Sequence, residues 1–212
     1  MLDEAPEFQP TVIEALRTPL ESGTITLGRS EVHARYPARF QLIMAANPCP
    51  CGQAATPGAD CRCAPATIRR YAEKISGPIR DRIDINQGFL PMRKAYLKQS
   101  MQTGETSAVV AGRVLEARQR QLRRLAGSGY RTNSEVSGNY LRRHLPLPDG
   151  LEAIDEAMNR GRLSARGADK VLRLTWTIAD LDGRDVPSRD HLGIALAMRR
   201  GDQPGSAVQR VG

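Results

Sequence analysis

Between Glu7 and Leu20, apolar side chains recur at the three- and four-residue spacing of a helix that buries one face. Pro10 suits the first turn of such a helix, because a first-turn residue needs no backbone N–H donor. Pro19 is expected to end or kink the helix. The chain therefore opens with a predicted helix, whose apolar positions are Phe8, Val12, Ile13, Leu16 and Leu20.

The pattern changes after this helix. Two short extended runs around a polar turn, between Gly23 and Tyr36, predict a β-hairpin. Phe40–Ala46 is a nearly continuous apolar run that ends at Asn47–Pro48, which is typical of a strand buried on both faces of a parallel sheet. These two elements predict an α/β arrangement for the first part of the chain.

The next segment, 48–65, is rich in Pro, Gly and Ala and is predicted to be a loop. Residues 66–75 predict a short helix that Gly77–Pro78 interrupts, and 82–86 begin an extended piece that ends near Pro91. One or two strands and a hairpin cannot form a covered parallel sheet, so this α/β part looks incomplete.

The remainder of the chain is predicted to be helical. Ser164 and Ser188 are suited to cap helices at their N-termini. One apolar stripe comprises Ala168, Val171, Leu172, Ile178 and Ala179. The predicted helices span 107–126, 134–144, 150–160, 164–182 and 188–199.

The predicted fold class is therefore α/β plus all-α. Residues 1–91 form a partial α/β core, 92–106 form a polar linker, and 107–200 form a helical domain. Residues 201–212 are rich in Gly, Gln and Ser and are predicted to be a disordered tail.

Composition excludes several classes of protein. Of the 212 residues, 40% are hydrophobic, which argues against a collagen-like or wholly disordered chain. No apolar run approaches the length of a membrane span, and the first residues are acidic rather than basic. We therefore expect a soluble, cytoplasmic protein with no membrane partner.

Charge is distributed unevenly. The chain has 31 Lys and Arg against 23 Asp and Glu, a formal net charge of +8. Residues 1–40 hold four Arg against six acids, whereas 61–131 hold fifteen Lys and Arg against five acids. This surplus is consistent with contact to phosphate or nucleic acid, or with an ordinary solvated basic face.

The four cysteines lie close together, in two C-x-C pairs. Clustering in a chain with no signal peptide favours a metal in a reducing compartment over a disulfide framework. Four thiolates can form a closed tetrahedral Zn²⁺ site, which leaves no open position for catalysis. The alternatives are free thiols, a stress-formed disulfide or iron–sulfur ligation. The candidate ligands are Cys49, Cys51, Cys61 and Cys63.

Polar residues that suit phosphate chemistry occur at four other places. Asp3 and Glu4 follow an apolar stub, and Asn47 follows the predicted buried strand. Arginines suit phosphate because the guanidinium makes paired contacts and stays charged. Arg82 lies beside a helix-breaking turn, and Arg166 lies at a helix start that favours anions. Each of these signals is also compatible with an ordinary surface or turn residue.

Together and in this order, these stretches resemble one family. The chain is similar to the C-terminal two-thirds of the ATPase module of the magnesium-chelatase I-subunit/ComM group of AAA+ proteins. The paired-cysteine loop favours the ComM-like branch, a group of bacterial hexameric DNA helicases that act in transformation and branch migration. The matching stretches, within residues 2–183, are LDEAPEF, LRTPLESG, YPARFQLIMAANPCPCG, CRCAPATIRRY, ISGPIRDRID and GRLSARGADKVLRLTWTIADLDG.

The resemblance implies a role for each matching residue. Asp3 and Glu4 are similar to the Walker B acids, with Asp3 toward Mg²⁺ and Glu4 as the base that polarises water. Asn47 corresponds to the sensor 1 residue and Arg166 to sensor 2. Arg82 corresponds to the arginine finger that reaches a neighbouring subunit, with Arg80 as the weaker candidate.

The resemblance also implies a fold, cofactors and partners. The helical domain corresponds to a AAA+ lid, and the intact protein binds ATP with Mg²⁺ in a homo-oligomeric ring, expected to be a hexamer, on DNA. The run 24–36 resembles a pre-sensor 1 hairpin that points into the pore of the ring. The residues expected to face nucleic acid are Arg29, Arg35 and Arg39.

The chain departs from the family in one large respect. None of its residues form the G-x-x-x-x-G-K-[ST] loop that cradles phosphates in this group, and the N-terminal Lon-protease-like domain of ComM-type proteins is not found. We therefore expect a fragment that does not hydrolyse ATP alone. Two other functions stay open: a chelatase-type motor for Mg²⁺ insertion into a porphyrin, and a non-enzymatic, zinc-stabilised basic binding module.

Overall fold

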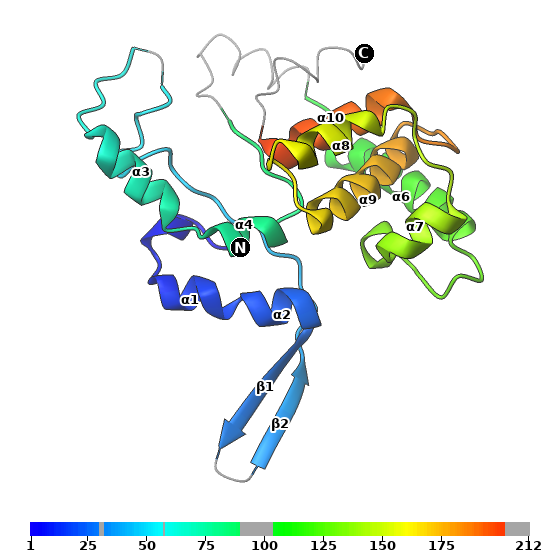
Figure 1. Cartoon of the computed structure of the whole chain (residues 1–212), viewed down its shortest axis with the longest axis horizontal. Coiled ribbons are helices and arrows are strands. Elements are labelled where there is room, and N and C mark those ends of the chain that lie inside the picture. Colours follow the sequence, from blue (N-terminus) through cyan, green and yellow to red (C-terminus); the bar gives the residue numbers. More distant parts are fainter. Residues whose placement is uncertain (30–31, 57, 90–103, 202–212) are drawn as a thin grey trace. The chain divides into compact units, whose positions relative to one another are not determined.

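The computed structural model describes residues 1–29, 32–56, 58–89 and 104–201 (Figure 1). The chain divides into two compact units, which we call the N-terminal unit, Met1–Ile83, and the helical unit, Asp84–Gly212. The predicted linker lies outside the described residues except for 104–106, and the predicted tail lies outside them except for Gly201.

The first predicted helix is present but broken in two. Pro10 occupies the first turn of the first part, as predicted. The break falls at Leu16, because Pro19 has no N–H with which to bond the carbonyl of Ala15 four residues earlier. Ile13 is buried, whereas Val12 is 48% exposed. The elements are the 3₁₀ helix η1 (Ala5–Glu7), α1 (Pro10–Ala15) and α2 (Arg17–Ser22).

The predicted β-hairpin is confirmed. Strands β1 (Thr24–Arg29) and β2 (Val32–Pro37) pair antiparallel, with Ile25 opposite Tyr36 and Leu27 opposite Ala34. Directly opposite residues point to the same face of a hairpin. Ile25, Leu27 and Tyr36 therefore form an apolar face, and these residues are 40%, 60% and 52% exposed.

The predicted buried strand at Phe40–Ala46 is wrong. In the described residues this segment forms only an isolated parallel bridge, between Leu2 and Met44. Phe40 is 46% exposed and Ile43 is 53% exposed. A strand is buried on both faces only when neighbouring strands and covering helices surround it, and the N-terminal unit supplies Leu2 as its partner.

Two short helices follow the cysteine loop. Helix α3 (Pro65–Glu73) corresponds to the predicted helix at 66–75. Helix α4 (Gly77–Arg82) was not predicted, since Gly77–Pro78 was interpreted as an interruption. These two residues instead begin α4, where proline is tolerated, and the hydroxyl of Ser76 accepts a hydrogen bond from the N–H of Ile79 at 3.4 Å. Arg82 therefore ends a helix rather than starting an extended piece.

The helical unit follows the predicted pattern except at 134–144, where the single predicted helix is a 3₁₀ turn followed by a helix that begins only at Gly138. Ser164 caps α9 by accepting a hydrogen bond from the N–H of Gly167 at 3.0 Å. Ser188 caps α10, and His191 Nδ1 accepts a reciprocal bond from the Ser188 N–H at 2.9 Å. The elements are α6 (Ser107–Arg124), η2 (Asn133–Glu135), α7 (Gly138–His144), α8 (Glu152–Asn159), α9 (Ala165–Leu181) and α10 (Arg189–Arg200).

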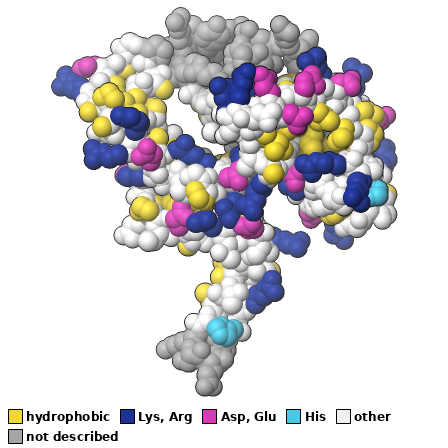
Figure 2. Space-filling model, viewed as in Figure 1, with side chains coloured by type: hydrophobic (Ala, Val, Ile, Leu, Met, Phe, Trp, Pro, Cys, Tyr) yellow, Lys and Arg dark blue, Asp and Glu magenta, His cyan; other side chains and the backbone are white. Residues whose placement is uncertain are grey.

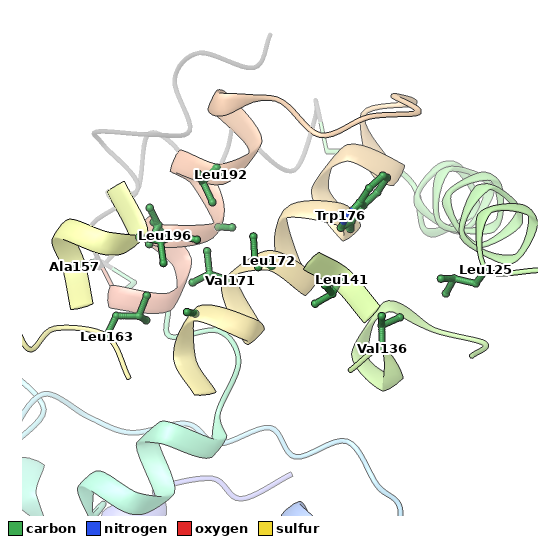
Figure 3. Packing of buried hydrophobic residues seen from close by; sticks show 13 residues of the cluster. Leu125, Val136, Leu141, Ala157, Leu163, Val171, Leu172, Trp176, Leu192 and Leu196 are labelled. Carbon is green, nitrogen blue, oxygen red and sulfur yellow. The ribbon is translucent and has the colours of Figure 1, made fainter. Parts of the chain in front are cut away.

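Helix α9 lies at the centre of the hydrophobic core of this unit. Leu192 and Leu196 on α10 approach Val171 and Leu172 on α9 (Figure 3). Trp176, on the same helix, is 2% exposed. The other buried members of the core are Leu125, Val136, Leu141, Ile154, Ala157, Leu163, Ala168 and Ala195.

The segment that enters the helical unit is tied to it by polar contacts. Lys170 Nζ lies 2.8 Å from a carboxylate oxygen of Asp84, and the Asn86 N–H donates to the carbonyl of Met198 at 2.8 Å. On the face of this unit seen in Figure 2, basic and acidic side chains are interspersed. None of the helices in the described parts of the chain has the length and apolar character needed to cross a membrane.

Candidate functional site

The acidic pair is held beside the segment that leads to Asn47. The Leu2 N–H donates to the Ile43 carbonyl at 2.8 Å, and the Ala45 N–H donates to the Leu2 carbonyl at 2.9 Å. The Ala5 N–H then donates to the Ala45 carbonyl at 2.9 Å. Asp3 and Glu4 therefore lie between Leu2 and Ala5, whose backbones are both hydrogen-bonded to residues 43–45.

The backbone at the acidic pair is unusual. Glu4 has φ 48° and ψ 43°, the left-handed region that side chains with a Cβ rarely adopt. Asp3 Oδ1 accepts a hydrogen bond from the Glu4 N–H at 3.0 Å, which supports this turn. Both acids are exposed. Strained backbone of this kind is often found at functional sites.

Asn47 lies at the end of the segment paired with Leu2. It is exposed, and the cysteine loop follows it directly. The Gly52 N–H donates to the Cys49 carbonyl at 2.9 Å, which turns the chain. Gly52 lies near the Asn47 side chain, at a distance where even an added Cβ would be 3.9 Å from Asn47 Oδ1.

The two arginines of α4 differ in their contacts. Arg82 forms an ion pair with Glu21 on α2, donates to the Pro78 carbonyl at 2.9 Å, and has a side chain 14% exposed. Arg80 donates to the Ala72 carbonyl in the last turn of α3 and to the Ile75 carbonyl just beyond that helix, with Nε 3.0 Å from the Ile75 oxygen. Arg80 therefore caps a neighbouring helix, a structural role that sequence reasoning did not predict.

The remaining arginines lie on the hairpin and in the helical unit. Arg35 is exposed on β2, opposite Thr26. Arg39 lies at the base of the hairpin, with its side chain beside Gly23. Arg29 ends β1, and its side chain lies outside the described residues. Arg166 is exposed in the first turn of α9.

The four cysteines converge. Their sulfur atoms all lie within 4.8 Å of one another, and no disulfide joins them. The Sγ atom of Cys49 is 3.3 Å from that of Cys51 and 3.9 Å from that of Cys61, and the Cys51 and Cys61 sulfurs are 3.6 Å apart. The clustering inferred from the two C-x-C pairs is therefore a cluster in space.

The thiols differ in their acidity. Burial opposes ionisation of Cys49, but hydrogen bonds from the Cys51 thiol and from backbone N–H groups, including that of Ala54, lower its pKa to about 6. The pKa of Cys61 is raised to about 11; a backbone bond from Cys63 favours the thiolate, but burial and the charge on Cys49 outweigh it. The pKa of Cys63 is raised for related reasons. Thiolates this close repel one another unless a cation lies among them.

Sequence reasoning missed Tyr71, a residue on α3 that feels the charge of Glu4 in the acidic pair and of Cys49 in the cysteine cluster. It is 4% exposed, and burial together with its contact to Glu7 raises the pKa of its hydroxyl, with smaller effects from the charges of Glu4 and Cys49. Lys74 Nζ lies 3.8 Å from a Glu7 oxygen and 5.4 Å from the centre of the Tyr71 ring. The spacing of Ile68, Tyr71 and Ile75 on a short helix was the available signal for a buried position.

Comparison with known families gives two matches that follow one another along the chain. The profile described as magnesium chelatase, subunit ChlI, matches residues 1–96. The profile described as magnesium chelatase, subunit ChlI C-terminal, matches residues 104–199. The two matches together span the N-terminal unit and the helices of the helical unit, except for the last residue of α10.

Curated relatives match over nearly the same residues. An uncharacterised protein of Mycobacterium tuberculosis is 46% identical over 200 residues, which is 94% of this chain and 39% of the relative. Competence protein ComM of Haemophilus influenzae is 38% identical over 199 residues, 93% of this chain and 38% of ComM. YifB of Escherichia coli is 36% identical over 204 residues, 95% and 39% of the two chains. The chain thus spans about two-fifths of the length of these relatives.

Proposed function

This chain belongs to the magnesium chelatase family, in its ComM-like branch, and we propose that it is part of an AAA+ ATPase that couples ATP hydrolysis to DNA translocation or branch migration. The observation that carries the proposal is the pairing of Leu2 with residues 43–45. This pairing keeps Asp3 and Glu4 beside the segment that ends at Asn47. Two carboxylates and an amide on adjacent segments suit a site that binds Mg²⁺ and positions a water molecule.

Each side chain has a defined role in this proposal. Asp3 would hold Mg²⁺, and the bound ion would supply charge neutralisation at the phosphates. Glu4 accepts a proton from the attacking water, and the Asn47 amide orients that water. Arg82 contacts the nucleotide bound to a neighbouring subunit. Arg166 contacts nucleotide from the helical unit, which acts as the lid of an AAA+ core. The exposed carboxylates of Asp3 and Glu4 fit a hard cation that prefers oxygen ligands.

The phosphate side of the site is not found in these 212 residues. They contain no G-x-x-x-x-G-K-[ST] sequence, the loop that binds the phosphates of ATP. The residues present suit Mg²⁺ binding and water activation but not phosphate binding. ATP hydrolysis is therefore proposed only for a longer polypeptide that supplies this loop. The proposed cofactors are Mg²⁺–ATP and a metal ion at the four-cysteine cluster.

DNA and further copies of the chain are the proposed partners. The hairpin supports a DNA contact, because it projects an apolar face and the exposed Arg35, with Arg39 at its base. A ring, proposed to be a hexamer, is supported by the resemblance of Arg82 to the arginine finger of this family, which reaches the nucleotide of a neighbouring subunit. The charge surplus in 61–131 favours an acidic polymer as the ligand.

The test compares the chain alone with a chimera. In the chimera, residues 1–212 follow the N-terminal region of the Mycobacterium tuberculosis relative, which is 46% identical over the shared part. The chain alone should show no ATP turnover above background. The chimera should turn over at a rate on the order of 1 s⁻¹ and be stimulated by DNA.

Glu4→Gln in the chimera should reduce turnover by about 10²-fold or more while ATP still binds, because the general base is lost. Glu7→Gln is the matched control, since Glu7 is exposed in the same short segment and should retain turnover. A chimera that binds ATP but gives equal rates for the two variants would contradict the assignment. Hydrolysis without DNA stimulation would favour the chelatase-type motor.

A further inference from the structure

We propose that one structural Zn²⁺ ion, bound by Cys49, Cys51, Cys61 and Cys63, orders the loop at 48–64 and thereby holds Asn47 at the end of the segment paired with Leu2. The proposal extends the proposed function by naming the metal at the cysteine cluster and its effect on the candidate sensor.

The separations between the sulfur atoms match those around a tetrahedral ion. With Zn–S bonds of about 2.3 Å, neighbouring sulfurs of a Cys₄ site lie about 3.8 Å apart. The separations of 3.3, 3.6 and 3.9 Å among Cys49, Cys51 and Cys61 bracket this value, and the fourth sulfur lies within 4.8 Å of the others. Only small side-chain adjustments are needed to bring four thiolates onto one centre.

The loop has few other means of holding its shape. Among its described residues, only Cys49 is buried. Its backbone hydrogen bonds are local, such as Thr56 N–H to the Gln53 carbonyl at 3.0 Å and Ala59 N–H to the Thr56 carbonyl at 3.1 Å. These bonds form turns but do not join the two halves of the loop. The thiols of the two C-x-C pairs are the groups that meet across it.

The ligand set selects the class of metal. Four soft sulfur ligands suit Zn²⁺ or an iron–sulfur cluster and not Mg²⁺. Four protein ligands fill a tetrahedral zinc site, so the ion is structural rather than catalytic. The Ala54 N–H lies 3.4 Å from Cys49 Sγ, and a hydrogen bond of this kind supports a metal-bound thiolate.

The position of Asn47 connects the metal site to the acidic pair. Cys49 follows Asn47 by two residues, and Gly52 lies near the Asn47 side chain. Upstream, the Ala45 N–H is bonded to the Leu2 carbonyl. Asn47 thus lies between the backbone pairing of Ala45 with Leu2 and the cysteine loop. Loss of the metal would loosen the loop and leave the pairing as the remaining restraint on Asn47.

The experiment uses the whole 212-residue chain, purified without a metal-affinity tag. Elemental analysis should find about one zinc per chain, the stoichiometry of a Cys₄ site. Cys61→Ser combined with Cys63→Ser should lose the metal, whereas the loop variant Thr56→Ala should keep it. Amide hydrogen exchange in 44–64 should become about tenfold faster or more in the double variant, since local opening controls exchange.

Two internal reporters show where the effect lies. Removal of zinc should shift the side-chain amide resonance of Asn47 but not that of Asn133, which is buried in the helical unit. Trp176, the single tryptophan, should keep its fluorescence. Iron with visible absorbance would overturn the identity of the metal. A metal-free chain with a protected loop would overturn the site, and an unchanged Asn47 signal on zinc loss would overturn its link to Asn47. No measurement uses nucleotide, so these outcomes are independent of the ATPase proposal.

Discussion

The guanidinium of Arg124 is paired with the carboxylate of Asp180 inside the helical unit, with Arg124 Nη2 2.7 Å from Asp180 Oδ2. Asp180 is 2% exposed, and Asn133 Nδ2 donates a further hydrogen bond to Oδ2 at 3.0 Å. The Arg124 guanidinium also lies 4.1 Å from the centre of the Trp176 ring. This network joins α6, η2 and α9 at the edge of the apolar core.

Removing one partner of this pair should destabilise the helical unit strongly. Asp180→Ala leaves a mostly buried positive charge, which costs about 3–5 kcal/mol in the free energy of unfolding. Urea denaturation followed by Trp176 fluorescence measures this loss. Glu156→Ala is the control, because its pair with Arg160 is exposed and is worth at most about 1 kcal/mol. Equal losses in the two variants would show that the Arg124–Asp180 pair is not the stabilising contact.

Arg82 should act across a subunit boundary in the proposed ring. In the chimera, Arg82→Ala should lower ATP turnover by about 10³-fold or more while nucleotide affinity is retained, as for an arginine finger. Mixing Arg82→Ala subunits with Glu4→Gln subunits should recover part of the activity, because some interfaces then combine an intact Glu4 with an intact Arg82. If mixed rings form and stay inactive, Arg82 acts within its own subunit, where the structure pairs it with Glu21.

The carboxylate of Glu14 should make the N-terminal unit sensitive to acid. The Ser76 hydroxyl, opposed by partial burial and aided by Arg17 and Arg82, lowers the pKa of Glu14 below its ordinary value. A lowered pKa in the folded state means that ionised Glu14 contributes stability above its unfolded pKa and loses that contribution as the pH falls through the folded value.

An NMR titration of the Glu14 side chain checks this expectation directly. The folded chain should give a pKa below the usual value of about 4.3 for glutamate. Ser76→Ala should raise it, because the largest cause of the shift is removed. An unchanged Glu14 pKa in the Ser76 variant would contradict the role of the hydroxyl.

The helices of the helical unit could be predicted because their signals are local. The stripe at Ala168, Val171 and Leu172 and the cap at Ser164 define α9 to within one residue at each end. The Arg124–Asp180 pair could not be predicted, since its two members lie 56 residues apart and meet only when α6 packs against α9. Periodicity identifies the face of a helix but not the helix that it contacts.

The N-terminal unit shows where sequence patterns mislead. The apolar run at Phe40–Ala46 is typical of a sheet interior, but burial depends on partner strands, and the described residues provide a single parallel bridge. Helix α4 was missed although Ser76 before Gly77–Pro78 is a usable start signal. The cysteine cluster was inferred correctly as a group, because thiols so close in sequence are easily brought together by one loop.

The left-handed backbone at Glu4 has a consequence for how this position tolerates change. An asparagine or glycine would adopt φ 48° more readily than glutamate, by roughly 1 kcal/mol, so local folding alone disfavours the residue found there. Random substitution filtered only for a well-folded N-terminal unit would therefore drift away from glutamate. Sequences selected for the chemistry of the carboxylate would instead retain glutamate. The frequency of glutamate relative to asparagine and glycine at this position would therefore report which selection acted.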